Sequence, residues 1–345
     1  MELLFHPFDL PLRHAFTISR GTSHVYRTLI VELQQDGVSG YGEAGENRFY
    51  GASLENMQAA LRGVRPRLET AKLDDPAELW EQLRPALQGN TFAQCALDIA
   101  AWDLFGKLRG APVWKLWGLR IDGPLPPTDY TIGIDTIETM VRKMNEFPDW
   151  PIYKIKLGTP HDLEIVRQLR RHTKAVFRVD ANGAWDAETT IRLSGPLKEL
   201  GVEFIEQPLP PDRWDDMKEV KRRSALPIIA DESCQVEGDV ERCREAFHGV
   251  NVKLVKCGGL TPARRMIEHA RRWGMKTMVG CMTESSVGIS AIAQLLPLLD
   301  YADMDGALLL ARDIATGVRI ERGRVLFPEE NGCGVRLIDA ARRPR

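Results

Sequence analysis

Eight short apolar segments recur through the chain, and a helical stretch separates each from the next. They lie at 129–134, 152–156, 176–180, 203–206, 228–231, 251–255, 276–280 and 301–303. Short apolar strands that alternate with helices are typical of a buried parallel sheet. Eight such units in about 200 residues predict a (β/α)8 barrel of the α/β class, whose active site lies at the C-terminal strand ends. A doubly wound open sheet is the rival fold, but it does not explain acidic residues at the ends of three consecutive strands.

The remaining segments predict a second, smaller domain. Residues 1 to about 45 read as strands, and a helical period follows from Leu54 to about Gly110. Strands followed by helices indicate an α+β unit, and Gly123-Pro-Leu-Pro-Pro127 makes a plausible linker. We predict an α+β domain at 1–122, the barrel at 123–315, and a C-terminal segment at 316–345 that rejoins the first domain.

Charge and hydropathy exclude several classes of function. The formal net charge of −2 shows no basic excess, so we expect no nucleic-acid partner. No apolar run reaches the roughly 18 residues of a membrane span, and the first residues lack a signal-peptide layout. The six cysteines show no metal-ligand or CxxC spacing, which is typical of reduced thiols. We therefore expect a cytoplasmic protein without a membrane partner, and a homo-oligomer.

Three acidic residues end consecutive strands of the predicted barrel. Asp180, Glu206 and Asp231 follow one another at intervals of about one strand-plus-helix unit, so their side chains converge at the barrel mouth. Three buried carboxylates repel one another unless a cation joins them, and an all-oxygen ligand set suits Mg²⁺. The alternative is that each acid caps the following helix. Asn182 and Glu232 come close behind and are interpreted as residues that support the ligands or cap helices.

Lysines flank these acids. Lys154 and Lys156 lie two apart and therefore point to one face of the second strand, and Lys253 lies on the sixth. The second and sixth strands of an eight-stranded barrel are opposite each other, so Lys156 and Lys253 would face one carbon from two sides. That arrangement suits inversion by 1,1-proton transfer, in which one lysine, neutral near pH 7, removes the α-proton and the other returns it. The metal and Lys154 would hold the enediolate charge. A solvated edge strand is the alternative for Lys154 and Lys156, and Lys256 is assigned to the following loop.

These residues form an ordered set of motifs. The pieces are Ala96-Leu-Asp-Ile-Ala-Ala-Trp-Asp103, Lys154-Ile-Lys156, Val179-Asp-Ala-Asn182, Ile205-Glu-Gln-Pro208, Ala230-Asp-Glu-Ser233 and Lys253-Leu-Val-Lys-Cys-Gly-Gly259. The set resembles the enolase superfamily, specifically its muconate-lactonizing-enzyme subgroup, through nearly the whole chain. The resemblance implies a cap of N- and C-terminal segments over the barrel, one Mg²⁺ on the three acids, and proton transfer by Lys156 and Lys253. The mandelate-racemase branch uses a His–Asp base, and none of the seven histidines here lies at a late strand end.

Two further acids point to the substrate. Asp303 and Asp305 end the eighth strand, across from the metal acids, and would meet a cation at the far end of the substrate. They resemble the Asp-x-Asp motif of dipeptide epimerases, including the L-Ala-D/L-Glu epimerases of peptidoglycan recycling, where an N-terminal ammonium is bound. Capping of the last helix is the alternative. Muconate cycloisomerisation, o-succinylbenzoate synthesis and N-succinylamino acid racemisation use substrates without an ammonium. An acid-sugar dehydratase or a non-catalytic binding barrel fits the lysines less well.

Loops of the first domain are expected to select the second residue of the dipeptide. The candidate residues for substrate binding are Arg20, His24, Arg48 and Tyr50 in these loops and Thr131, Met282 and Glu284 at strand ends. In the Ala-Glu enzymes an arginine of the first loop is expected to hold the glutamate side chain. The matching position here is Ser23. Arg48 or His24 would have to replace that arginine, so the identity of the second residue stays open.

Overall fold

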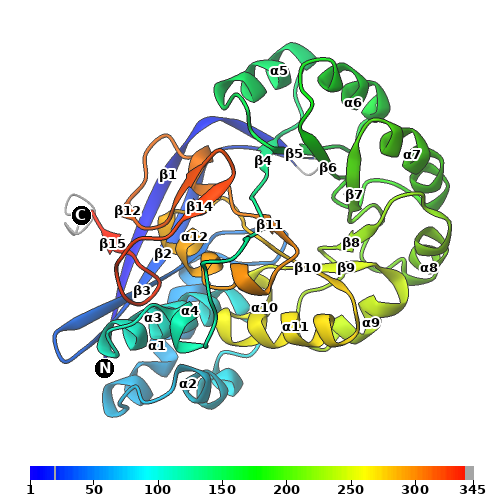
Figure 1. Cartoon of the computed structure of the whole chain (residues 1–345). Helices are drawn as coiled ribbons and strands as arrows, with labels where there is room; N and C mark the ends of the chain where they lie inside the picture. Colours follow the sequence, from blue (N-terminus) through cyan, green and yellow to red (C-terminus); the bar gives the residue numbers. More distant parts are fainter. Residues whose placement is uncertain (19–20, 339–345) are drawn as a thin grey trace.

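The computed structural model describes residues 1–18 and 21–338 and shows a ring of eight parallel strands (Figure 1). The ring consists of β4 (Tyr130–Ile132), β5 (Ile152–Lys156), β6 (Val176–Asp180), β7 (Val202–Glu206), β8 (Ile228–Ala230), β9 (Gly249–Val252), β10 (Lys276–Gly280) and β11 (Tyr301–Asp303). Neighbours pair in chain order from β4 to β11. A parallel bridge between Thr128, which precedes β4, and Ala302 of β11 closes the ring. The predicted barrel is confirmed, because an open sheet has no such closing contact.

Helices cover the outside of the ring (Figure 1). They are α5 (Ile137–Glu146), α6 (Asp162–Arg170), α7 (Ala187–Glu199), α8 (Trp214–Arg223), α9 (Asp239–Ala246), the short α10 (Leu254–Cys257), α11 (Leu260–Arg272) and α12 (Ser286–Ala293). Each of the longer outer helices turns an apolar stripe to the barrel and a charged face to solvent, as α11 does with Met266 and Ile267 buried and Arg271 and Arg272 exposed. Within residues 1–18 and 21–338, no helix is long and apolar enough to cross a membrane.

The sixth strand differs from its predicted range. β9 ends at Val252, and the chain then turns into the single helical turn of α10. Leu254 and Val255 are buried, which gives the segment the apolar texture of a continuing strand. Gly258 and Gly259 have φ angles of 99° and 123°, which glycine adopts without strain, and they end the turn. Lys253 therefore lies just beyond the strand.

The N-terminal residues form the predicted α+β unit. It contains β1 (Glu2–Ile18), β2 (Gly21–Gln35), β3 (Val38–Gly45), α1 (Leu54–Thr70), α2 (Pro76–Leu83), α3 (Thr91–Leu108) and α4 (Val113–Leu116). The strands form an antiparallel sheet in the order β1-β2-β3. A Cβ atom on Gly42 would lie 2.0 Å from the Ala96 oxygen, and one on Gly40 would lie 2.3 Å from the Ala100 oxygen. Glycine at both positions therefore lets β3 rest directly on α3, which is buried on nearly all sides.

The C-terminal segment packs on this unit (Figure 1). It contains β12 (Ala315–Thr316), β13 (Arg319–Glu321), β14 (Arg324–Leu326) and β15 (Arg336–Leu337). The amide of Val113 donates to the carbonyl of Gly332 at 2.9 Å, and the amide of Cys333 donates to Asp103 Oδ1 at 2.8 Å. The segment thus contacts the N-terminal unit as expected, while the domain boundaries at 122 and 315 stay predictions. All six cysteines are free thiols.

Candidate active site

Three acids meet at the C-terminal end of the barrel. Asp180 and Glu206 are the last residues of β6 and β7, and Asp231 follows the last residue of β8. One oxygen of each lies within 4.8 Å of the others, and all three side chains are buried. Burial, with the neighbouring carboxylates, raises the pKa of Glu206 to about 7. Three converging carboxylates that repel one another form an all-oxygen donor set that fits a hard divalent cation.

The backbone behind these acids is held in sparsely populated conformations. Asn182 and Gln207 have φ angles of 46° and 34°, in the region that favours glycine. Gln207 accepts hydrogen bonds from the amides of Asp231 and Ser233, both at 3.0 Å, and so ties the β7 loop to the β8 loop. The Asn182 amide donates to Asp180 Oδ1 at 2.8 Å, and its side chain donates to Glu232 at 3.4 Å. The two predicted supporting residues therefore lie beside the acids. Gln207 was missed, although it stands inside the Ile205-Glu-Gln-Pro208 motif.

Two lysines reach the acids from opposite sides of the barrel. Lys156 Nζ lies 2.6 Å from Asp180 Oδ2, and Lys253 Nζ lies 2.9 Å from Asp231 Oδ2. β5 and β9 stand four strands apart in a ring of eight, so they face each other across the mouth. Both lysines are buried yet line one cavity of about 700 Å³ between the barrel and the cap loops. The structure therefore brings the two predicted proton carriers to the two sides of one space.

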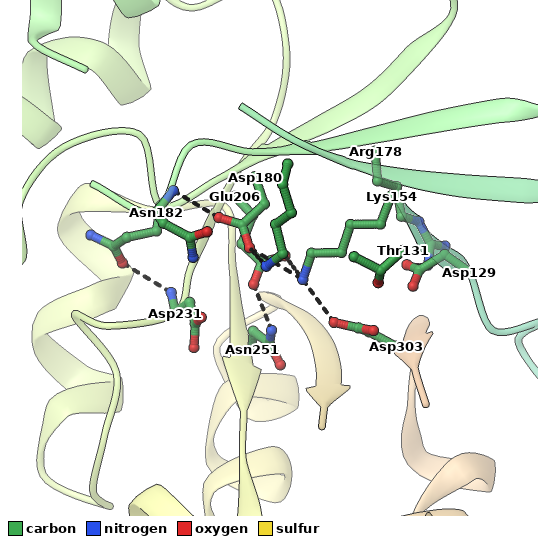
Figure 2. A network of polar contacts seen from close by, with 12 residues as sticks. Asp129, Thr131, Lys154, Arg178, Asp180, Asn182, Glu206, Asp231, Asn251 and Asp303 are labelled. Carbon is green, nitrogen blue, oxygen red and sulfur yellow. Dashed lines mark hydrogen bonds and ion pairs between the residues drawn. The ribbon is translucent and has the colours of Figure 1, made fainter. Parts of the chain in front are cut away.

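Lys154 lies between the cluster of three acids and the eighth strand (Figure 2). Its Nζ is 2.8 Å from Glu206 Oε2, 3.3 Å from Asp180 Oδ2 and 2.7 Å from Asp303 Oδ2. Burial alone would lower the pKa of Lys154, but these carboxylates outweigh burial and raise it well above its usual value. Lys154 is thus a buried ammonium ion, as its predicted role of holding negative charge requires.

Lys253 is also held as an ammonium ion in its ion pair. Burial lowers its pKa, but Asp231 outweighs burial and the pKa is raised well above the ordinary value. The expected neutral lysine therefore requires that a cation engage Asp231, because a paired carboxylate favours the charged amine.

Two buried residues of the sixth strand region support the acids. Asn251 Nδ2 donates to Glu206 Oε1 at 2.8 Å. Lys256 Nζ donates to Asp231 Oδ1 at 2.6 Å, so its assignment to the following loop is wrong. Asn251 was missed, although it stands two residues before Lys253 and therefore on the same face of the predicted strand. Lys256 could not be placed by strand alternation, because the chain has already turned into α10.

Asp303 and Asp305 form the opposite wall of the cavity. Burial raises the pKa of Asp303, but Lys154 outweighs it and lowers the pKa to about 2. Asp305 Oδ2 accepts from the Thr131 amide at 2.6 Å, and Cys281 Sγ lies 4.0 Å from Oδ1. Burial and the adjacent Asp303 raise the pKa of Asp305 to about 7. The two acids thus sit side by side, one paired with a lysine and the other without a cation among the described residues.

Most of the predicted substrate-binding residues line the same cavity, namely Arg48, Tyr50, Thr131, Met282, Asp303 and Asp305. Arg20 lies outside the described residues. His24 is exposed, and the cavity is lined by its neighbours Ser23 and Val25, because successive strand residues face opposite sides. Glu284 does not line the cavity either. Its buried side chain accepts a hydrogen bond from the Met282 amide at 2.9 Å. Burial raises the pKa of Glu284 to about 8.

The fold and the site together form a capped barrel with a cluster of three acids between two opposed lysines. Residues 137–341 match the family "Enolase C-terminal domain-like", and residues 4–118 match "Mandelate racemase / muconate lactonizing enzyme, N-terminal domain". The chain therefore belongs to the enolase superfamily, and the predicted family is confirmed.

Named relatives cover almost the whole chain. An L-Ala-D/L-amino acid epimerase of Flavobacterium johnsoniae is 54% identical over 98% of this chain and 100% of its own length. An L-Ala-D/L-Glu epimerase of Bacteroides thetaiotaomicron is 39% identical over 98% of this chain and 88% of its own. A dipeptide epimerase of Cytophaga hutchinsonii, crystallised with Mg and D-Ala-L-Val, superposes with a TM-score of 0.92 at 27% identity, over 98% and 95% of the two chains.

Proposed function

We propose that this chain is a Mg²⁺-dependent dipeptide epimerase that inverts the α-carbon of the C-terminal residue. The observation that carries the proposal is the placement of Lys156 and Lys253 on opposite walls of one cavity, with the acid cluster between them. Inversion requires a proton to leave one face of the carbon and another to arrive at the opposite face. The epimerase activities of the named relatives support the same reaction.

Asp180, Glu206 and Asp231 are the residues that would hold the metal. When bound, Mg²⁺ polarises the substrate carboxylate and so acidifies the neighbouring α-carbon. Lys154 adds a fixed positive charge beside Glu206, where negative charge develops on the deprotonated substrate. Lys156 or Lys253 takes the α-proton, depending on the configuration of the substrate, and the other lysine donates a proton to the opposite face.

Asp303 and Asp305 are proposed to bind the N-terminal ammonium of the dipeptide. They face the acid cluster across the cavity, and Asp305 has no cationic partner among the described side chains. An ammonium group one peptide bond away from the reacting carbon would supply the missing cationic partner of Asp305. Substrates of the N-succinyl, o-succinylbenzoate and muconate reactions carry no such group, so the pair of acids favours a dipeptide over them.

The second residue of the dipeptide is proposed to lie against the cap loops. Phe16, Ile18, Val25, Phe49 and Tyr50 line this side of the cavity. Val25 and Phe49 remain 48% and 50% exposed, so an apolar substrate side chain would cover them. Arg27 is paired with Glu46 at 3.1 Å. Among the described residues of the cap loops, this leaves Arg48 as the cation that could bind a glutamate side chain. We expect L-Ala-L-Leu to react at least as well as L-Ala-L-Glu.

A dipeptide library in D₂O tests the proposal. We expect deuterium at the α-carbon of the C-terminal residue, together with formation of the other diastereomer, measured by mass spectrometry and NMR. An N-acetylated partner of each reacting dipeptide is the matched control, because it lacks the ammonium. Equal turnover of free and N-acetylated dipeptides would contradict the dipeptide assignment, and absence of exchange in every substrate would contradict the reaction.

A further inference from the structure

Lys256 is a buried lysine whose contacts are all with the barrel wall. Its Nζ donates to the Asp231 carbonyl at 2.5 Å, to Asp231 Oδ1 at 2.6 Å and to the Asn251 carbonyl at 3.3 Å. An ammonium group has three protons to donate, and these three acceptors use them. Only 2% of the residue is exposed, and it is not among the described residues that line the cavity. Lys256 therefore has no donor left for a substrate.

The place of Asp231 in the sheet explains why it needs such a partner. The pairing of β8 with β9 ends at Ala230 and Val250, so Asp231 lies one residue beyond the last ladder pair. Its position is not fixed by strand hydrogen bonds. Lys256 contacts both the main chain and the side chain of Asp231 and joins them to Asn251 on the neighbouring strand. A side chain thus continues the β8–β9 connection where the ladder has stopped.

The two carboxylate oxygens of Asp231 have different partners. Oδ1 is taken by Lys256, while Oδ2 lies 2.9 Å from Lys253 at the cavity. We propose that Lys256 is a positioning residue that fixes Asp231, so that Oδ2 is the oxygen presented to a divalent cation. The inference rests on the metal site of the proposed function and adds a residue that holds one of its ligands.

Orientation and charge predict opposite effects when Lys256 is removed. Loss of a nearby cation would by itself strengthen the binding of Mg²⁺, because like charges repel. Loss of the contacts would free the carboxylate to rotate, and removal of a group that orients a metal ligand typically weakens metal binding by roughly 10- to 100-fold. The direction of the change therefore separates a positioning residue from a counter-charge.

The experiment measures Mg²⁺ binding by isothermal titration calorimetry, without substrate, in wild type and Lys256→Met. Methionine has a similar shape and no charge or donor. We expect the dissociation constant for Mg²⁺ to rise by about 10- to 100-fold. Lys107→Met is the matched control. Lys107 Nζ contacts Asp103 Oδ2 at 2.6 Å and the carbonyls of Ser39 and Val335 at 3.1 Å each, in the cap. This variant loses the same kind of contacts and should bind Mg²⁺ like wild type.

Lys256→Met that binds Mg²⁺ as tightly as wild type, or more tightly, overturns the inference, and so does an equal loss in the Lys107→Met control. If Lys256→Met does not fold, as judged by circular dichroism, Lys256→Arg replaces it. Arginine keeps the charge, but its planar fork cannot reproduce the three contacts, so unchanged Mg²⁺ affinity there would also overturn the inference. Wild-type protein that binds no Mg²⁺ would instead refute the metal site itself, and the inference with it.

Discussion

Binding of a dipeptide should depend on pH through Asp305. Burial and Asp303 raise the pKa of Asp305 to about 7. The charge of Asp303 is already paired with Lys154 at 2.7 Å, so ionised Asp305 supplies the charge that an incoming ammonium requires. With a pKa of about 7, roughly one tenth of Asp305 is ionised at pH 6 and one half at pH 7. Affinity should therefore rise about fivefold between these pH values. Above about pH 8 the ligand amine loses its own proton, and binding should fall again.

The assay compares two ligands that do not change during the measurement. Glycine has two equivalent α-hydrogens, so L-Ala-Gly stays the same compound when a proton is exchanged. Its dissociation constant is measured at saturating Mg²⁺ from pH 6 to pH 7 and divided by that of N-acetyl-L-Ala-Gly, which lacks the ammonium. The ratio cancels any effect of pH on the metal acids. Asp305→Asn should bind L-Ala-Gly weakly and without this pH dependence. A flat ratio in wild type, or the same rise in Asp305→Asn, would refute the reasoning.

Three further predictions concern the lysines, the metal and the cap. Lys156→Ala and Lys253→Ala should each lose about 10²- to 10⁴-fold in epimerisation rate with unchanged circular dichroism, since each removes one proton carrier; full activity in either would contradict the two-base scheme. Chelation by EDTA should abolish deuterium exchange, and added Mg²⁺ should restore it; exchange that persists would contradict the metal. Asp98 accepts from the Thr261 amide and hydroxyl at 2.8 and 2.7 Å, and burial raises its pKa to about 7. The folded state therefore favours the neutral acid, and its contribution is complete below about pH 4 and lost as the pH rises through about 7. Melting temperatures of wild type should fall relative to Asp98→Asn over that range, and parallel curves would show that Asp98 does not titrate there.

Strand periodicity predicted the barrel and the acid cluster because both follow from local rules. Each barrel strand is a short apolar run, and each acid stands where such a run ends, so Asp180, Glu206 and Asp231 could be placed from the sequence. Lys154 and Lys156 followed from alternation along one strand. The same rule failed for Lys256, because the chain leaves β9 at Val252 and turns into α10 before it reaches that residue.

The roles of Gln207 and Glu284 depend on tertiary contacts and could not be predicted from the sequence. Gln207 supports Asp231 through a loop that crosses to the next strand, and no periodic pattern marks such a contact. Glu284 looked like a loop acid, but it packs beside Glu43 of the cap, which accepts hydrogen bonds at the start of α12. Only the docking of cap and barrel removes Glu284 from the cavity, and that docking joins segments far apart in the chain.

Lys154 connects the two ends of the proposed ligand site. One ammonium group lies within hydrogen-bonding distance of both Glu206 of the acid cluster and Asp303 at the end of β11 (Figure 2). An ammonium ligand at Asp303 would compete with Lys154 for that carboxylate, and the released lysine would turn its charge fully toward the metal acids. A bound N-terminal amine would then strengthen the positive field at the reacting carbon as well as anchor the substrate. Substrates that lack the amine would leave Lys154 shared between Glu206 and Asp303. Under the proposed function, recognition of the amine and stabilisation of charge at the acid cluster would therefore depend on the same side chain.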